Sequence, residues 1–191
     1  MTSTKKSNGL SVYFLTVTGV MAALCCISNL IRIPLGESKI SISNTVCVLC
    51  GLILGPTGGF LSAGLGNFLY DIFTGYGYES IITFVSKGAI ALVAAGMTAK
   101  IRREDKLSGA DSPRLFIAAA LAALTYVALY MLKTFIFGLT VNGLTMEGTL
   151  AKMGAKLPAS LINAAFATAV APIFYLAVRP ALKHLDALKK M

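Results

Sequence analysis

Residues 44–87 read NTVCVLCGLILGPTGGFLSAGLGNFLYDIFTGYGYESIITFVSK, and this stretch decides the fold. It holds three apolar runs, the first two separated by Gly55-Pro56 and the last two by the loop TGYGYES at residues 74–80. Asp71 closes the second run and Lys87 lies inside the third. A charged side chain at membrane depth is costly, so it faces a bundle interior or a wet cavity. The stretch therefore predicts membrane helices around a functional polar site.

The composition of the whole chain is that of a membrane protein. Of its 191 residues, 56% are hydrophobic and 13% are charged, and the mean hydropathy is +0.76. A soluble domain has about 25% charged residues. Since one span needs about 20 residues, we predict an all-α membrane protein with a single domain over residues 1–191. It is expected to be one bundle of six transmembrane helices, with spans at about 10–33, 44–54, 57–73, 81–99, 115–138 and 158–178.

The basic residues orient this bundle. The net charge is +9, but the lysines and arginines sit in short clusters at the ends of apolar runs, so we expect no nucleic-acid partner. With both termini cytoplasmic, eleven basic residues face the cytoplasm and four face outward. Cytoplasmic loops carry the excess of Lys and Arg. The sequence therefore predicts cytoplasmic N- and C-termini in a multi-pass protein of the lipid bilayer.

Polar residues gather toward the outer end of the predicted bundle. They come from at least four segments, whereas the inner halves of the spans are apolar and small. Lysines near a helix end can instead reach the headgroups, and asparagines can simply join neighbouring helices. Lys87 is too deep for the first alternative, so a ligand or a pairing with Asp71 is expected there. The predicted substrate-binding residues are Asn67, Asp71, Tyr76, Tyr78, Lys87, Lys133 and Asn163.

The sequence carries few signs of catalysis. It has no phosphate-binding Gly-x-x-x-x-Gly-Lys-Ser/Thr loop and no Gly-x-Ser-x-Gly elbow. Cys47 and Cys50 form a Cys-x-x-Cys pair, but without a second pair or a nearby histidine we expect packing residues rather than a metal or redox site. We therefore expect no enzyme, cofactor or metal. The alternatives are a stand-alone ion-coupled secondary transporter of a small metabolite and, with only Cys-x-x-Cys in favour, a membrane enzyme or assembly protein.

Four stretches resemble the S components of energy-coupling factor (ECF) vitamin transporters, most closely the riboflavin-type branch. They are TGVMAALCCISNLIRIP (18–34), GLILGPTGGFLSAGLGNFLYDIFTGY (51–76), TFVSKGAIALVAAGM (83–97) and LPASLINAAFATAVAPIFY (157–175). The second stretch is the most specific, because it combines Leu-Gly-Pro with small-residue spacing up to Asp71.

This resemblance implies a six-helix substrate-binding subunit in the plasma membrane that holds one vitamin near its outer face. It also implies two kinds of partner, a membrane coupling subunit and two cytoplasmic ATPases. The family's Ala-x-x-x-Ala docking pattern in the first span corresponds here to Gly19-x-x-x-Ala23, with Ala22 beside it. At the matching positions, Asn67, Asp71, Lys87 and Asn163 are the implied ligand contacts. Riboflavin is the first candidate, and pyridoxine, the pyrimidine half of thiamine and pantothenate stay open.

Overall fold

The structure is a computed structural model, and it describes residues 12–35, 38–77, 79–103 and 111–183. Its helices, in chain order, are α1 (Val12–Ser28), α2 (Ser43–Phe73), α3 (Glu79–Met97), α4 (Ala99–Arg103), α5 (Asp111–Thr140) and α6 (Met146–Lys183), and its strands are β1 (Arg32–Leu35) and β2 (Ser38–Ser41). Four of these helices, α2, α3, α5 and α6, are long and apolar enough to cross a membrane, and α1 is a shorter apolar helix. The predicted helical membrane fold is confirmed.

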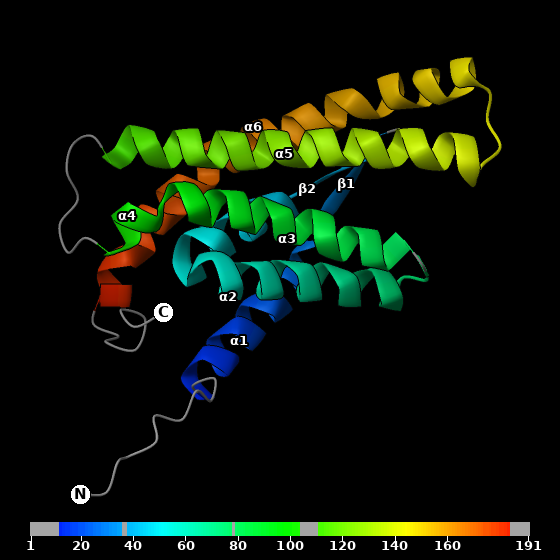
Figure 1. Cartoon of the computed structure of the whole chain (residues 1–191). Helices are drawn as coiled ribbons and strands as arrows, with labels where there is room; N and C mark the ends of the chain where they lie inside the picture. Colours follow the sequence, from blue (N-terminus) through cyan, green and yellow to red (C-terminus); the bar gives the residue numbers. More distant parts are fainter. Residues whose placement is uncertain (1–11, 36–37, 78, 104–110, 184–191) are drawn as a thin grey trace, which may run out of the picture.

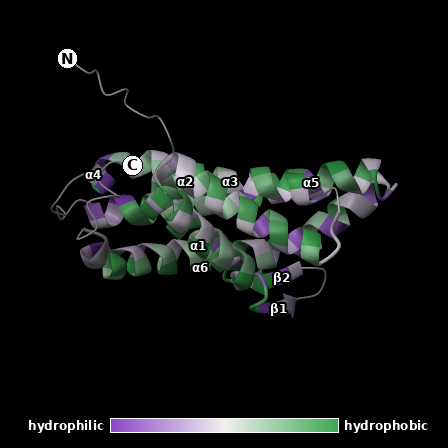
Figure 2. Ribbon diagram, turned by 90° about the horizontal axis from the view of Figure 1, so that it is seen from below, coloured by the Kyte–Doolittle hydropathy of each residue, from purple (hydrophilic) through white to green (hydrophobic). Residues whose placement is uncertain are grey.

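The helices pack in an order that brings distant parts of the chain together. α2 packs against α1 and α3, α3 packs against α5, and α5 lies beside α6 (Figure 1). Hydrophobic residues run along the lengths of the helices (Figure 2). The centre of the bundle is built from small, fully buried side chains, among them Ala91, Ala94, Ala119 and Ala122. Small residues let helix backbones approach closely, which compensates for the weak hydrophobic drive between helices in lipid.

α2 is broken at Gly55, where the sequence predicts the boundary between two spans. Gly55 has φ 77° and ψ −168°, a conformation that only glycine adopts easily, and Pro56 follows it. The two arms of α2 fold back on each other and pack closely. A Cβ added to Gly59, in the second arm, would lie only 2.8 Å from the Cα of Gly51 in the first. The total of six spans and the cytoplasmic termini stay predictions.

The first helix, α1, ends earlier at its C-terminus than the sequence predicts. The sequence predicts that it continues to Ile33, but α1 ends at Ser28, and β1 (residues 32–35) pairs with β2 (residues 38–41) as an antiparallel strand. The helix ends because side chains take over the carbonyl of Cys25. The Oγ of Ser28 and the Nδ2 of Asn29 both donate to it, at 2.7 Å and 2.9 Å.

The last helix, α6, begins earlier in the chain than the sequence predicts. We expected a loop up to residue 157, but α6 begins at Met146. Thr145 caps this start, because its Oγ1 accepts from the backbone N–H of Gly148 at 3.2 Å. Pro158 is then an interior residue of a long helix rather than its first residue. The extra three turns extend α6 alongside the end of α5, and both flank a cavity.

Candidate ligand-binding pocket

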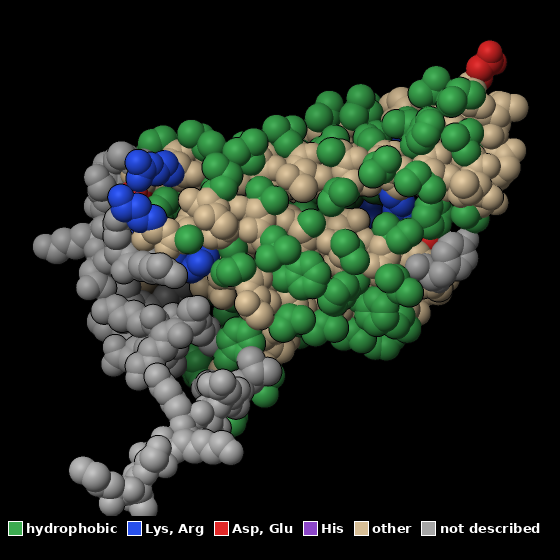
Figure 3. Space-filling model, in the orientation of Figure 1, with side chains coloured by type: hydrophobic (Ala, Val, Ile, Leu, Met, Phe, Trp, Pro, Cys, Tyr) green, Lys and Arg blue, Asp and Glu red, His purple; other side chains and the backbone are tan. Residues whose placement is uncertain are grey.

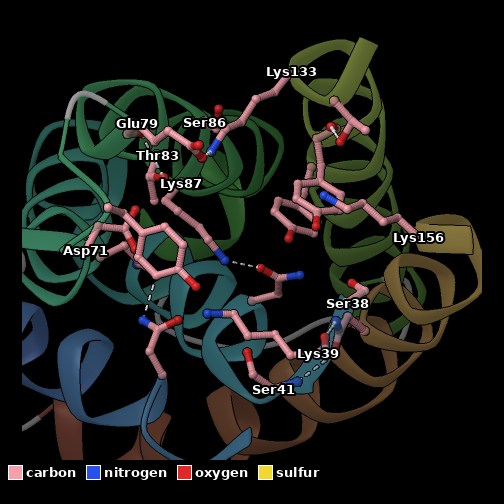
Figure 4. Close-up of a pocket in the computed structure, with 18 of the residues that line it drawn as sticks. Ser38, Lys39, Ser41, Asp71, Glu79, Thr83, Ser86, Lys87, Lys133 and Lys156 are labelled. Atoms are coloured by element: carbon pink, nitrogen blue, oxygen red, sulfur yellow. Dashed lines mark hydrogen bonds and ion pairs between the residues drawn. The ribbon is translucent and has the colours of Figure 1, made fainter. Parts of the chain in front are cut away.

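A polar cavity of about 430 Å³ opens at one end of the bundle. It lies where α2 and α5 end and where α3 and α6 begin, with strand β2 across it (Figure 4). Figure 3 shows lysine or arginine atoms in a recess between α3 and α5, far from the basic cluster at the opposite end. The residues that line the cavity are Asn29, Ser38, Lys39, Ser41, Asn44, Asn67, Asp71, Tyr76, Glu79, Thr83, Ser86, Lys87, Tyr126, Tyr130, Lys133, Thr134, Phe137, Asn142, Lys152, Lys156 and Asn163.

The predicted site residues converge on this cavity. They come from α2, the loop that follows it, α3, α5 and α6. Tyr78 lies outside the described residues. The other six line the cavity, namely Asn67, Asp71, Tyr76, Lys87, Lys133 and Asn163. Their role in binding a ligand stays a prediction.

Lys87 forms the deep wall of the cavity. It lies eight residues into α3, about 12 Å from the helix start at about 1.5 Å per residue, and only 8% of it is exposed. Its Nζ donates to the Oδ1 of Asn44 at 2.5 Å and lies 4.6 Å from the centre of the Tyr126 ring. Within the described residues, no carboxylate lies within 4.0 Å of this ammonium group. The suggested ion pair with Asp71 is therefore not formed.

Asp71 supplies the acidic side of the cavity. Only 9% of the residue is exposed, and in the described part of the chain its carboxylate has no hydrogen bond and no ion pair. In Figure 4 it lies on the same side of the pocket as Glu79 and Thr83. Burying a carboxylate without partners is unfavourable. Asp71 is thus well placed to accept hydrogen bonds from a ligand.

Lys39 approaches the cavity from strand β2. Its Nζ lies over the rings of Tyr70 and Tyr76, at 5.0 Å and 5.8 Å from their centres. Burial lowers the pKa of Lys39 to about 8, and the positive charges of Lys87 and Arg32 lower it further, against an opposing effect of Asp71. The lysine therefore titrates close to neutral pH.

The far wall of the cavity is aromatic. Tyr126 and Tyr130, one turn apart on α5, stack with ring centres 5.6 Å apart and planes inclined by 14°. The Nζ of Lys156 lies 5.6 Å from the centre of the Tyr130 ring. Nearby, the Nζ of Lys133 pairs with the Oε2 of Glu79 at 2.7 Å, which links α5 to α3.

Asn67 lies at the cavity wall but is already fully bonded. Its Nδ2 donates to the carbonyl of Ala63 at 2.7 Å and to the Sγ of Cys47 at 3.2 Å. Its Oδ1 accepts from Asn29 at 2.9 Å and from Ser43 at 2.8 Å. An amide has two donors and two acceptor lone pairs, so all of its capacity is used. Asn67 joins Asn29, the residue that follows α1, to both arms of α2.

Asn163 likewise bonds the protein itself. Its Nδ2 donates to the carbonyl of Lys39 at 2.8 Å, and its Oδ1 accepts from the backbone N–H of Ser41 at 2.9 Å. These bonds fasten β2 to α6. Asn163 thereby sets the position of the hairpin that carries Lys39 into the cavity.

The small residues of α1 divide between two faces. Gly19 and Ala23 are exposed, and a Cβ added to Gly19 would meet nothing within 4 Å. Ala22 is buried, and a Cβ added to Gly66 would overlap its carbonyl oxygen. The outward face of α1 therefore offers Gly19 and Ala23, while Ala22 packs against α2.

The cysteines lie in the core below the cavity. The Sγ atoms of Cys25 and Cys50 are 3.5 Å apart, and Cys25, Cys47 and Cys50 are fully buried. Among the described residues, no three His, Cys, Asp or Glu side chains are grouped to hold a metal ion.

Several lining residues were not predicted from the sequence. Asn44, Lys39, Tyr126 and Tyr130 are the main ones. The tyrosines had a signal, since Tyr126, Tyr130 and Lys133 follow helical spacing and share one face of α5. Asn44 carries no such signal, because its partner Lys87 is distant in the sequence.

These features define a class of protein: a multi-pass helical membrane protein with a polar pocket at one end of its bundle. A sequence profile described as "ECF-type riboflavin transporter, S component" matches residues 9–180. The chain belongs to this family, whose members are vitamin-binding transporter subunits rather than enzymes.

A solved structure supports the fold. It is described as "Structure and mechanism of the S component of a bacterial ECF transporter", and it matches with a TM-score of 0.68. The match covers 90% of this chain and 98% of the solved one at 15% sequence identity. A search of curated proteins finds no match.

Proposed function

We propose that this chain is the high-affinity substrate-binding subunit of an ECF-type ABC transporter in the plasma membrane, with riboflavin as the first candidate substrate. The observation that carries the proposal is the polar cavity of about 430 Å³, into which α2, α3, α5 and α6 all direct side chains. Small-molecule sites are commonly cavities of about 300–1,000 Å³ with a few polar groups. Riboflavin is the first candidate because the description of the matching family names it.

The cavity offers three kinds of contact to a vitamin. The stacked Tyr126 and Tyr130 give an aromatic wall for a planar ring. Asp71 accepts hydrogen bonds from amine, imide or hydroxyl groups, and the lysine ammonium groups donate to ring nitrogens, carbonyls or acids. Riboflavin, pyridoxine, the thiamine pyrimidine and pantothenate each match part of this set.

The proposed transport cycle needs partners. The sequence has no phosphate-binding loop, so energy would come from two cytoplasmic ATPases acting through a membrane coupling subunit. The exposed Gly19 and Ala23 of α1 are the proposed contact, since small residues allow a second helix to approach closely.

The test is a thermal-shift screen of the purified protein in detergent against a panel of B vitamins. A ligand that binds only the folded state raises the melting temperature as its concentration rises. At a concentration of 100 times its Kd, it increases the free energy of unfolding by about 2.7 kcal/mol. We expect one vitamin to do so without ATP or an ion gradient. A panel with no stabilising vitamin would contradict the proposal, as would gradient-driven uptake into liposomes that hold this chain alone.

A further inference from the structure

The cavity contains more positive than negative charge. Five of its lining residues are lysines, and two are carboxylates. One pair is internally compensated, because Lys133 and Glu79 form an ion pair at 2.7 Å. That leaves Asp71 as the single carboxylate lining the cavity with four lysines, Lys39, Lys87, Lys152 and Lys156.

None of these four lysines is neutralised within the described residues. No carboxylate lies within 4.0 Å of their amino groups, and Lys39, Lys87 and Lys156 instead lie over tyrosine rings. A buried ammonium group needs a counter-charge to offset its desolvation. Tyrosine faces and the neutral amide of Asn44 supply only part of it. The buried Lys87 ammonium group and the half-buried Lys39 therefore have no carboxylate partner of their own, and an anionic ligand would supply one.

The lysines are arranged so that one anion can meet more than one of them. In Figure 4 the side chains of Lys39 and Lys87 end close to one another in the middle of the pocket, although they come from β2 and α3. The two charges also influence each other, since Lys87 lowers the pKa of Lys39. Two ammonium groups converging from different elements favour a carboxylate or phosphate between them.

We propose that the physiological ligand is acidic and that its carboxylate or phosphate binds between Lys39 and Lys87, with the rest of the molecule toward Tyr126 and Tyr130. This inference rests on the proposed function and names the substrate class of the same site, where it favours an acidic vitamin over riboflavin, the candidate that the family description gives. It separates the candidates, because pantothenate and phosphorylated vitamins carry such a group and riboflavin and pyridoxine do not.

The experiment uses matched pairs that differ only in the acidic group. They are riboflavin and riboflavin 5′-phosphate, pyridoxine and pyridoxine 5′-phosphate, and pantothenol and pantothenate, titrated calorimetrically into the purified full chain. We expect the acidic member of the binding pair to bind more tightly by about tenfold or more. The pair that responds distinguishes a phosphate from a carboxylate.

Variants locate the effect. Lys39→Gln and Lys87→Gln should each reduce the difference within the binding pair to about twofold or less, and Lys39→Arg should retain it, because the positive charge is kept. Lys100→Gln is the matched control, since Lys100 lies in α4, at the other end of the bundle. Thermal unfolding of each variant verifies folding. If Lys87→Gln does not fold, Lys39→Gln and Lys39→Arg decide the question.

Three outcomes overturn the inference in different ways. If the neutral member binds as tightly as the acidic one, the acidic ligand is excluded while the vitamin-binding function stands. If the acidic member is preferred equally by the wild type and by Lys39→Gln, the acidic group of the ligand binds at a place in the protein other than between Lys39 and Lys87. Binding of none of the six compounds would contradict this inference, and the proposed function itself falls only if the panel of B vitamins also contains no stabilising vitamin.

Discussion

Asn163 of α6 pairs with the backbone around Lys39 of β2 as a neighbouring strand would. It donates to the carbonyl of Lys39 and accepts from the N–H of Ser41, across 124 positions of sequence in the first case. The hairpin β1–β2 is also tied to α2 by the Nη1 of Arg32, which donates to the Tyr70 hydroxyl at 2.7 Å. The Asn163 amide therefore helps to position a wall of the cavity.

Replacing that amide should loosen the hairpin. Asn163→Leu keeps a similar volume but removes both hydrogen bonds, so we expect the free energy of unfolding to fall by about 1–3 kcal/mol. The affinity for the ligand should fall as well, because Lys39 is no longer held. Calorimetry and thermal unfolding measure the two effects. Leu161→Ala, on the exposed side of α6, is the control, and equal affinities in both variants would contradict a positioning role.

Ligand affinity should depend on pH through Lys39. The pKa of this lysine is lowered to about 8 by burial and by the nearby charges of Lys87 and Arg32. An anionic ligand raises that pKa, so binding takes up a proton and affinity falls as the pH rises above about 8. Calorimetric titrations at about pH 7 and about pH 9.5 measure this change.

The variant Lys39→Arg tests whether Lys39 is the group whose loss of a proton lowers the ligand affinity. Arginine stays charged over this range, with a pKa above about 12, so the loss of affinity above about pH 8 should disappear. A loss of the same size in this variant would assign the titration to another group. Affinity independent of pH in the wild type would contradict an ammonium contact from Lys39.

The contact between α1 and α2 should not tolerate a side chain at Gly66. A Cβ there would overlap the carbonyl of Ala22 and lie 2.6 Å from the Cβ of Cys25. Overpacking of this kind costs about 1–3 kcal/mol, so Gly66→Ala should lower the melting temperature clearly. Gly19→Ala, on the same pair of elements but in open space, should leave it nearly unchanged. Equal melting temperatures would contradict the close approach of these helices.

Docking and ligand binding should be separable on α1. Gly19→Leu and Ala23→Leu place bulk on the exposed face, away from the cavity, so vitamin affinity should stay within about twofold of wild type. Co-purification with the coupling subunit should be lost. Retained co-purification would move the proposed docking surface to another face, and a loss of vitamin binding would show that these residues also support the pocket.

The features of the fold that the sequence predicts are those with strong local signals. The apolar runs and Gly55-Pro56 indicate the long helices and the break in α2. The hairpin was not predicted, because the first span was expected to continue to residue 33, although the alternation in residues 38–41 is typical of a strand. The start of α6 was missed because its first turns are polar where they face the cavity, and a polar segment between apolar runs was read as a loop.

For the site, charge at membrane depth was the useful signal. Asp71 and Lys87 stand out against apolar neighbours, and both line the cavity. The bonds of Asn67 and Asn163 agree with the alternative that asparagines join neighbouring segments, but their particular partners were not predictable from the sequence. Each has all or part of its amide bonded to segments distant in sequence, and spacing does not reveal such partners. Asn44 was missed for the same reason, because only the folded chain brings it to Lys87.

The most direct test of the central claim is a calorimetric titration of the purified chain with the vitamin that stabilises it most, in wild type and in Lys87→Met. Lys87 lines the cavity, and only 8% of it is exposed. The account predicts binding of one vitamin per chain without nucleotide, weakened by about tenfold or more in Lys87→Met, equal to about 1.4 kcal/mol. Unchanged affinity in a folded Lys87→Met protein would contradict it.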